Sequence, residues 1–152
     1  MKTAIVYYSK HHGNTKRLVD AIARLGDITL IDASSGGRTD LSAYDLIGFA
    51  SGTYGFQLHT SVLEFAEEHL PRGKRVFVVY TYGAKRPKTD ALVRIFRAKA
   101  AQLLGTFGCP GFCTFGPFRL IGGIAKGRPS EQDITEAVTF FNELIARCAE
   151  KT

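Results

Sequence analysis

The residues from Thr3 to Tyr8 form an unbroken run of apolar and β-favouring side chains. Such a run constrains the fold strongly, because a strand that is apolar on both faces must be covered on both sides. The chain then changes to helical spacing over Thr15–Leu25, where Leu18, Val19 and Ile22 fall on one face. A buried strand followed by an amphipathic helix predicts a parallel sheet with helices packed against it.

The same alternation continues along the chain, except that the connection after the second strand holds at most one helical turn, at Thr39–Ala43. We therefore expect an α/β fold: a doubly wound, five-stranded parallel sheet in a three-layer α/β/α arrangement, with residues 1–152 as a single domain. The predicted strands are Thr3–Tyr8, Ile28–Ile31, Tyr44–Ala50, Arg75–Thr81 and Thr106–Phe115. Two of the predicted helices are Thr15–Leu25 and Thr89–Leu104. The other two are predicted from capping boxes, one formed by Ser61 and Glu64 and one formed by Ser130 and Asp133.

Cysteine usage and the apolar stretches limit the classes of protein. Three cysteines are an odd number, and the spacing of Cys109 and Cys113 is not the C-x-x-C of redox or zinc motifs, so we expect neither a disulfide framework nor a metal site. Glycines and prolines interrupt the longest uncharged stretch, Ala100–Phe118, so we expect no integral membrane segment. No secretory leader is recognisable, and we expect a cytoplasmic protein.

The net charge of +6 leaves several partners open. A positive net charge is found in proteins that bind nucleic acid, anionic membranes or acidic proteins, and it is also found in proteins whose charged surface is simply solvated. The sequence has no block of five consecutive basic residues and no recognised nucleic-acid motif, so we expect no nucleic-acid binding.

The loop after the first strand has the composition of a phosphate-binding turn. It leaves a buried strand, contains a glycine, has hydroxyls at both ends and enters a helix, whose N-terminal N–H groups favour an anion. It matches neither the Walker A motif nor the dinucleotide fingerprint, so a single phosphate monoester fits best, with an ordinary turn capped by Thr15 as the alternative. The candidate residues are Ser9, Lys10, His11, His12, Gly13, Asn14 and Thr15.

The segment Ile5–Thr15 resembles the FMN phosphate loop of flavodoxins, whose usual form is S/T-x-T-G-x-T. The residues that match are Ser9, Gly13, Asn14 and Thr15. One residue is extra, and His11 and His12 stand where the family has a threonine and where the insertion falls. The resemblance extends over essentially the whole chain, through the element order and the segment Gly127–Ser130 before the last helix, and the length is similar to that of short-chain flavodoxins. It implies that FMN is the cofactor.

The resemblance also implies that the loops after the third and fourth strands hold the isoalloxazine ring. Tyr54, Phe56 and Tyr82 are the candidate stacking residues, with Phe56 as a core anchor in the alternative. Lys85, Arg86 and Lys88 would form a basic rim or simply a solvated loop. The residues predicted to bind FMN in these loops are Ser51, Gly52, Thr53, Tyr54, Gly55, Phe56, Thr81, Tyr82, Gly83 and Ala84.

The sequence thus predicts a flavodoxin-like electron carrier that works through non-covalent FMN and needs no catalytic side chain of its own. Its basic charge predicts a redox partner with an acidic surface, or an anionic membrane face. Two alternatives remain open: an FMN-dependent NAD(P)H:quinone or flavin reductase, or haem-pathway oxidase, of the same fold, and a flavin-free binding module. His59 and His69 are expected to be surface and structural residues, respectively.

Overall fold

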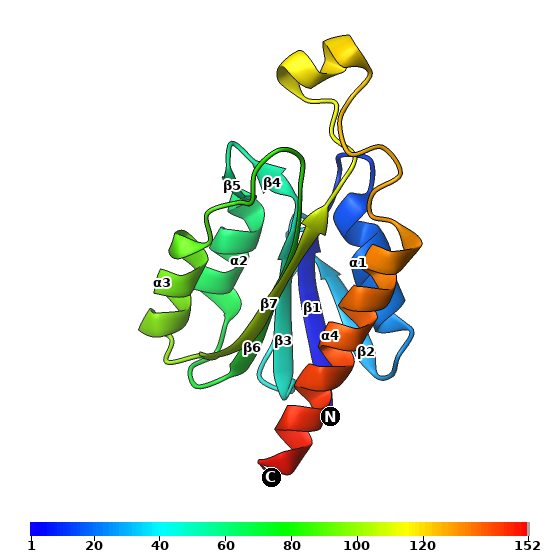
Figure 1. The fold of residues 1–152 in the computed structure, drawn as a ribbon. Helices are drawn as coiled ribbons and strands as arrows, with labels where there is room; N and C mark the ends of the chain where they lie inside the picture. The colour runs from blue at the N-terminus through cyan, green and yellow to red at the C-terminus, as the bar shows by residue number, and fades with distance from the viewer. Residues whose placement is uncertain (152) are drawn as a thin grey trace.

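Five parallel strands form one sheet in the order β2-β1-β3-β6-β7 (Figure 1). The structure is a computed structural model that describes residues 1–151. A separate pair of two-residue strands, β4 and β5, forms a small antiparallel hairpin. The elements in chain order are β1 (Thr3–Tyr8), α1 (Asn14–Ala23), β2 (Ile28–Asp32), β3 (Leu46–Ser51), β4 (Thr53–Tyr54), β5 (Gln57–Leu58), α2 (Thr60–His69), β6 (Arg75–Tyr82), α3 (Asp90–Ala98), β7 (Gln102–Pro110), the 3-10 helix η1 (Gly116–Ile121) and α4 (Glu131–Glu150).

Helices cover both faces of the sheet, as Figure 1 shows: α1 and α4 lie on one face, and α2 and α3 lie on the other. Two apolar cores result. Leu18 of α1 and Phe141 of α4 pack on the first face, while Val62 of α2 and Phe96 of α3 pack on the second. All six residues of β3 are buried, as expected for a central strand covered on both sides. The predicted three-layer flavodoxin-like fold is confirmed.

The order of the strands defines where a ligand is expected. From β1 the chain moves outward to β2 and then returns to β3 on the other side of β1, so the winding direction reverses between β1 and β3. In open α/β sheets, ligands bind outside the carboxyl ends of the strands at such a reversal. The loops after β1, β3 and β6 all leave the sheet at this edge.

The third helix and the last strand differ from the prediction. The helix ends at Ala98 rather than Leu104, because Ala100 adopts a left-handed φ of 51° and the N–H of Ala101 donates to the carbonyl of Phe96 at 2.8 Å. These two features form a Schellman-type C-terminal cap. The strand therefore starts at Gln102 instead of Thr106 and ends at Pro110, not Phe115. The sequence did not indicate that the helix ends at Ala98, because apolar residues continue at helical spacing beyond it.

Two predicted helix starts have different outcomes. The predicted capping box of Ser61 and Glu64 is wrong: His59 caps α2, and its side chain accepts from the N–H of Ser61 at 3.2 Å. The capping box of Ser130 and Asp133 on α4 is confirmed. No helix within residues 1–151 is both long enough and apolar enough to span a membrane.

Candidate functional site

The loop between β1 and α1 places free donors at the N-terminus of a helix. His12 and Gly13 both have left-handed backbone conformations, with φ of 55° and 64°, which turn the chain sharply into α1. The hydroxyl of Ser9 accepts from the N–H of Lys16 at 3.0 Å, so it satisfies the third N–H of the helix. The first two N–H groups, of Asn14 and Thr15, have no partner within the helix by its geometry. They lie at the positive end of the helix dipole, where an anion is stabilised.

Buried hydroxyls join this loop to the loop after β3 and to the end of β6. Thr15 is 1% exposed, and its Oγ1 lies 2.9 Å from Oγ1 of Thr81 on β6. The hydroxyl of Thr53 donates to the carbonyl of Thr81 at 2.8 Å. Ser51 is fully buried; its hydroxyl donates to the carbonyl of Gly52 and accepts from the N–H of His59. The structure thus brings the three predicted loops together.

An aromatic cluster lies beside these hydroxyls. The rings of Tyr8 and His59 stack with their centroids 3.6 Å apart, and Tyr54 meets both rings edge-on. Burial raises the pKa of Tyr54, although the backbone N–H groups of Lys10 and His11 act in the opposite direction. His59, which we predicted to be a surface residue, is a half-buried member of this cluster, and burial followed by the charge of Lys10 lowers its pKa.

The two other candidate stacking residues differ in exposure. Phe56 is 59% exposed with a φ of 63°, so it is not a core anchor. Its carbonyl accepts from the N–H of Lys88 at 2.7 Å, which ties the loop after β3 to the loop after β6. Tyr82 is half-buried, and the Arg86 guanidinium lies 5.2 Å from its ring centroid. A cavity of about 320 Å³ adjoins these loops and is lined by Gly55, Phe56, Gln57, Lys85, Arg86 and Lys88.

The segment after β7 contacts the β1–α1 loop from the other side. Nδ2 of Asn14 donates to the carbonyl of Phe112 at 2.8 Å, and Nε2 of His12 lies 3.0 Å from Oγ1 of Thr114. Nε2 of His11 accepts from the N–H of Thr114 at 3.4 Å. Burial lowers the pKa of His11, and the neighbouring His12 lowers it further. Neither Phe112 nor Thr114 was predicted to contact the β1–α1 loop, because neither residue belongs to a recognisable sequence motif.

The remaining glycines and Ala84 shape the backbone of the site. Gly55 has a φ of 56°, and Gly52 lies against the Tyr54 ring. A Cβ on Gly83 would approach Cβ of Cys113 to 2.8 Å, so only glycine lets the loop after β6 pass the segment after β7. Ala84 is exposed at the turn that follows.

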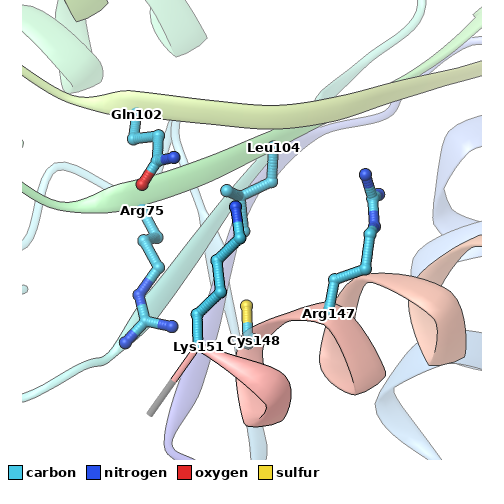
Figure 2. Close-up of a pocket in the computed structure, with 6 residues that line it drawn as sticks. All are labelled: Arg75, Gln102, Leu104, Arg147, Cys148 and Lys151. Atoms are coloured by element: carbon cyan, nitrogen blue, oxygen red, sulfur yellow. The ribbon is translucent and has the colours of Figure 1, made fainter.

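A second cavity lies at the opposite end of the sheet, away from every predicted site residue. It has a volume of about 220 Å³, and Figure 2 shows its side chains coming from β6, β7 and the end of α4. Cations near the carboxyl end of a helix interact favourably with its dipole, which accounts for Arg147 and Lys151 without a ligand. The lining residues are Arg75, Gln102, Leu104, Arg147, Cys148 and Lys151.

Within residues 1–151, no group of three or more histidines, cysteines or acidic residues could hold a metal ion. Cys109 is buried, and desolvation raises its pKa to about 12, so its thiol is not ionised at neutral pH. His69 packs against Phe65 with ring centroids 4.6 Å apart, in agreement with a structural role.

Comparisons with known proteins agree with this architecture. The chain is 32% identical over 148 residues to a protein of Methanocaldococcus jannaschii, covering 95% of this chain and 99% of that one. A flavodoxin from the domain Archaea has a TM-score of 0.70 at 18% identity, covering 95% of this chain and 99% of its own.

Two further solved structures have the same fold. General stress protein 14 of Treponema denticola, solved in complex with FMN, has a TM-score of 0.67 at 14% identity over 95% of this chain and 99% of its own. An NADPH-quinone reductase of P. pentosaceus has a TM-score of 0.65 at 9% identity over 92% of this chain and 97% of its own. Residues 5–110 match the family model of the flavodoxin domain. The chain therefore belongs to the flavodoxin family.

Proposed function

We propose that this protein binds FMN without a covalent bond at the carboxyl edge of β1, β3 and β6, and that it carries one or two electrons. The observation that carries the proposal is the β1–α1 loop. Its two consecutive left-handed residues, His12 and Gly13, present the first N–H groups of α1 at the point where the sheet reverses its winding.

The donor set suits a phosphate monoester attached to an uncharged planar ring. The helix N-terminus and the β1–α1 loop supply N–H, hydroxyl and imidazole groups for the phosphate. The loops after β3 and β6 supply Tyr54, Phe56 and Tyr82 as flat surfaces for the ring. When bound, FMN would supply the electron chemistry, while the chain binds it, orients it and shields it from water.

The experiment that tests this proposal is a binding titration with FMN and riboflavin, which lacks the phosphate. Thr15→Ala removes a hydroxyl that can donate to a charged acceptor, a contact worth about 1.5–3 kcal/mol. FMN affinity should fall at least about tenfold, while riboflavin, already a weaker ligand of the parent, should lose little. Thr29→Ala on β2, where the side chain is exposed, is the matched control. Equal weakening of both ligands would contradict the phosphate assignment.

A second function, an NAD(P)H-dependent reductase of the same fold, is favoured by the cavity lined by Phe56, Lys85, Arg86 and Lys88. Three cations around one hollow beside the predicted ring site would suit the phosphates of a nicotinamide nucleotide. Stopped-flow mixing of the FMN-loaded protein with NADPH separates the two functions. Direct bleaching of the flavin absorbance supports the reductase, and no reaction supports the carrier. A purified protein that neither has flavin colour nor takes up FMN would exclude both functions in favour of a flavin-free module.

A further inference from the structure

The segment between β7 and α4 leaves the body of the molecule. Cys113 and Ile124 exchange two backbone hydrogen bonds, of 3.0 and 2.8 Å, and so form a short two-stranded stalk. Between them, residues 115–121, which we call the tip, contain η1. Figure 1 shows the tip, in yellow, projecting beyond the edge of the sheet where the β1–α1 loop lies.

The tip exposes large apolar side chains. Phe115 is 77% exposed, Leu120 89% and Ile121 71%, and none of the η1 residues is buried. These are the three highest exposures of large hydrophobic side chains in residues 1–151, and all three occur within seven residues of sequence. A single exposed leucine needs no explanation, but a cluster of this kind indicates an interaction surface.

The charge around the tip has one sign. The sequence contains no aspartate or glutamate between Asp90 and Glu131, a stretch that includes the tip, the stalk and the approach to α4. Arg119 on the tip and Lys126 just after the stalk are both exposed, and Lys10 of the adjoining β1–α1 loop is exposed as well. The exposed apolar side chains therefore belong to a segment that carries cations and no carboxylate.

We propose that the tip docks on the surface of an anionic lipid bilayer, with Leu120 and Ile121 entering the headgroup region and Arg119 and Lys126 facing lipid phosphates. A projecting tip suits a deformable apolar medium, whereas a protein partner would need a hollow that matches it. Apolar burial combined with electrostatic attraction is the ordinary basis of such peripheral binding. This inference does not depend on FMN.

Docking in this way would orient the molecule. The stalk contacts the β1–α1 loop through Thr114 and His12, and Phe112 accepts from Asn14. The tip and the predicted phosphate loop therefore share one end of the molecule. A membrane-bound tip would bring the carboxyl edge of the sheet toward the lipid, within reach of a reactant dissolved there.

The sharpest test uses the absence of tryptophan from the chain. Leu120→Trp places a single tryptophan on the tip, and its emission should shift to the blue when vesicles containing equal parts of phosphatidylglycerol and phosphatidylcholine are added. Leu25→Trp is the matched control, because Leu25 is 42% exposed in the connection after α1, at the opposite end of the sheet. A shift at position 120 and none at 25 supports the proposal. No shift at position 120, or equal shifts at both, overturns it.

A co-sedimentation assay with the same vesicles tests the energetic role of the tip. The double substitution Leu120→Ser and Ile121→Ser leaves the charge unchanged and should weaken binding at least tenfold, while Leu25→Ser should bind like the parent. Binding should also fall at high salt and on pure phosphatidylcholine. Two results would overturn the proposal: equal binding to neutral vesicles, or a parent protein that is dimeric without lipid and becomes monomeric in the double variant, since a second copy would then cover the tip.

Discussion

The two ends of the sheet use polar side chains in different ways. At the carboxyl end, Asn14, Thr15, Ser51 and Thr81 are buried, and their side chains bond to groups on other loops or strands or to the adjacent backbone. At the amino end, the half-buried Lys74 donates to the carbonyls of Ser42 and Tyr44, and Arg147 and Lys151 are exposed. Burying polar groups costs free energy unless they are paired. The chain places most of its buried hydrogen-bonding side chains where the geometry of several loops must be fixed, which supports a site at that end.

The largest expected effect comes from the aromatic side chains of the carboxyl end. Tyr54→Ala and Tyr82→Ala should each weaken FMN binding by about 1–3 kcal/mol, the range found for stacking of a planar base on an aromatic ring. Flavin fluorescence should also brighten, because an adjacent electron-rich ring quenches it. Tyr44→Ala, a half-buried tyrosine at the amino end, is the control and should leave FMN affinity unchanged. If fluorescence stays quenched in both variants, Phe56 or another residue stacks on the flavin.

The next effect concerns stability at the start of α4. Asp133 is 4% exposed, and the hydrogen bonds from Arg128, of 2.5 and 2.8 Å, are the main reason that its pKa is lowered. Asp133→Asn should reduce the free energy of unfolding by about 1–2 kcal/mol, because the ion pair with Arg128 is lost and the acceptor of the capping box becomes uncharged. Because the folded pKa is the lower one, this stability is present above pH 3.8 and is lost as the pH falls through the folded pKa.

Chemical denaturation at pH 7 and at pH 3 measures this effect. The difference in the free energy of unfolding between the parent and Asp133→Asn should be larger at pH 7 than at pH 3. Asp27→Asn, an exposed carboxylate before β2, is the control and should change little. A constant difference between parent and variant at both pH values would mean that the contribution comes from packing and not from the ionised carboxylate.

A smaller effect is expected from the histidines of the β1–α1 loop. The pKa of His11 is lowered without ligand, mainly by burial, so the ring is neutral at pH 7.5. A bound phosphate favours the charged imidazolium, so FMN binding should take up a proton, and affinity should rise about threefold to tenfold as the pH falls from 8 to 6.5. Isothermal titration in two buffers of different ionisation enthalpy measures this uptake. His11→Gln should lose it, whereas His69→Gln should keep it. Equal uptake in both variants would remove His11 from the site.

The smallest effect concerns the second-electron potential of bound FMN. Lys85 and Arg86 would stabilise the negative charge of the fully reduced flavin, but both are exposed, so each contributes at most about 1 kcal/mol, or about 40 mV. Lys85→Gln and Arg86→Gln should therefore each lower this potential by tens of millivolts or less, while Arg147→Gln at the amino end should not change it. Spectroelectrochemistry measures these shifts. No difference between the three variants would place the basic rim away from the ring.

Much of the fold could be predicted from the sequence, because buried strands and amphipathic helices have periodicities that local sequence reveals. Thr3–Tyr8 and the capped start of α4 were both predicted. The end of α3 was missed because Ala100 takes the left-handed conformation that usually needs glycine, and the apolar spacing runs past it. The start of α2 was missed because histidine is an unusual N-cap and its role depends on the bond to Ser61.

The site was predictable only in part. The three loops were expected to meet, since parallel strands end at a common edge, and the hydroxyl contacts of Thr15, Thr53 and Thr81 bring them together. The contributions of Phe112 and Thr114 depend on a segment about 100 residues away folding back over His12 and Asn14. The exposed apolar tip was not predicted either. The sequence shows that Phe115, Leu120 and Ile121 are apolar, but only the packed structure shows that they are exposed.

The buried hydroxyls of Thr15 and Thr81 share one hydrogen bond, and its direction decides which hydroxyl proton remains available to a ligand. Thr15 and Thr81 each carry one hydroxyl proton, and their oxygens are 2.9 Å apart, so only one of them donates to the other. If Thr15 donates, its proton cannot reach an anion in the β1–α1 loop; if Thr81 donates, the proton of Thr15 is available. A phosphate in the loop therefore selects the arrangement in which the proton of Thr81 points toward Thr15. Arrival of a phosphate in the β1–α1 loop would thus reorient a dipole on β6, which lies two strands from β1 in the sheet order and adjoins the loop predicted to hold the ring.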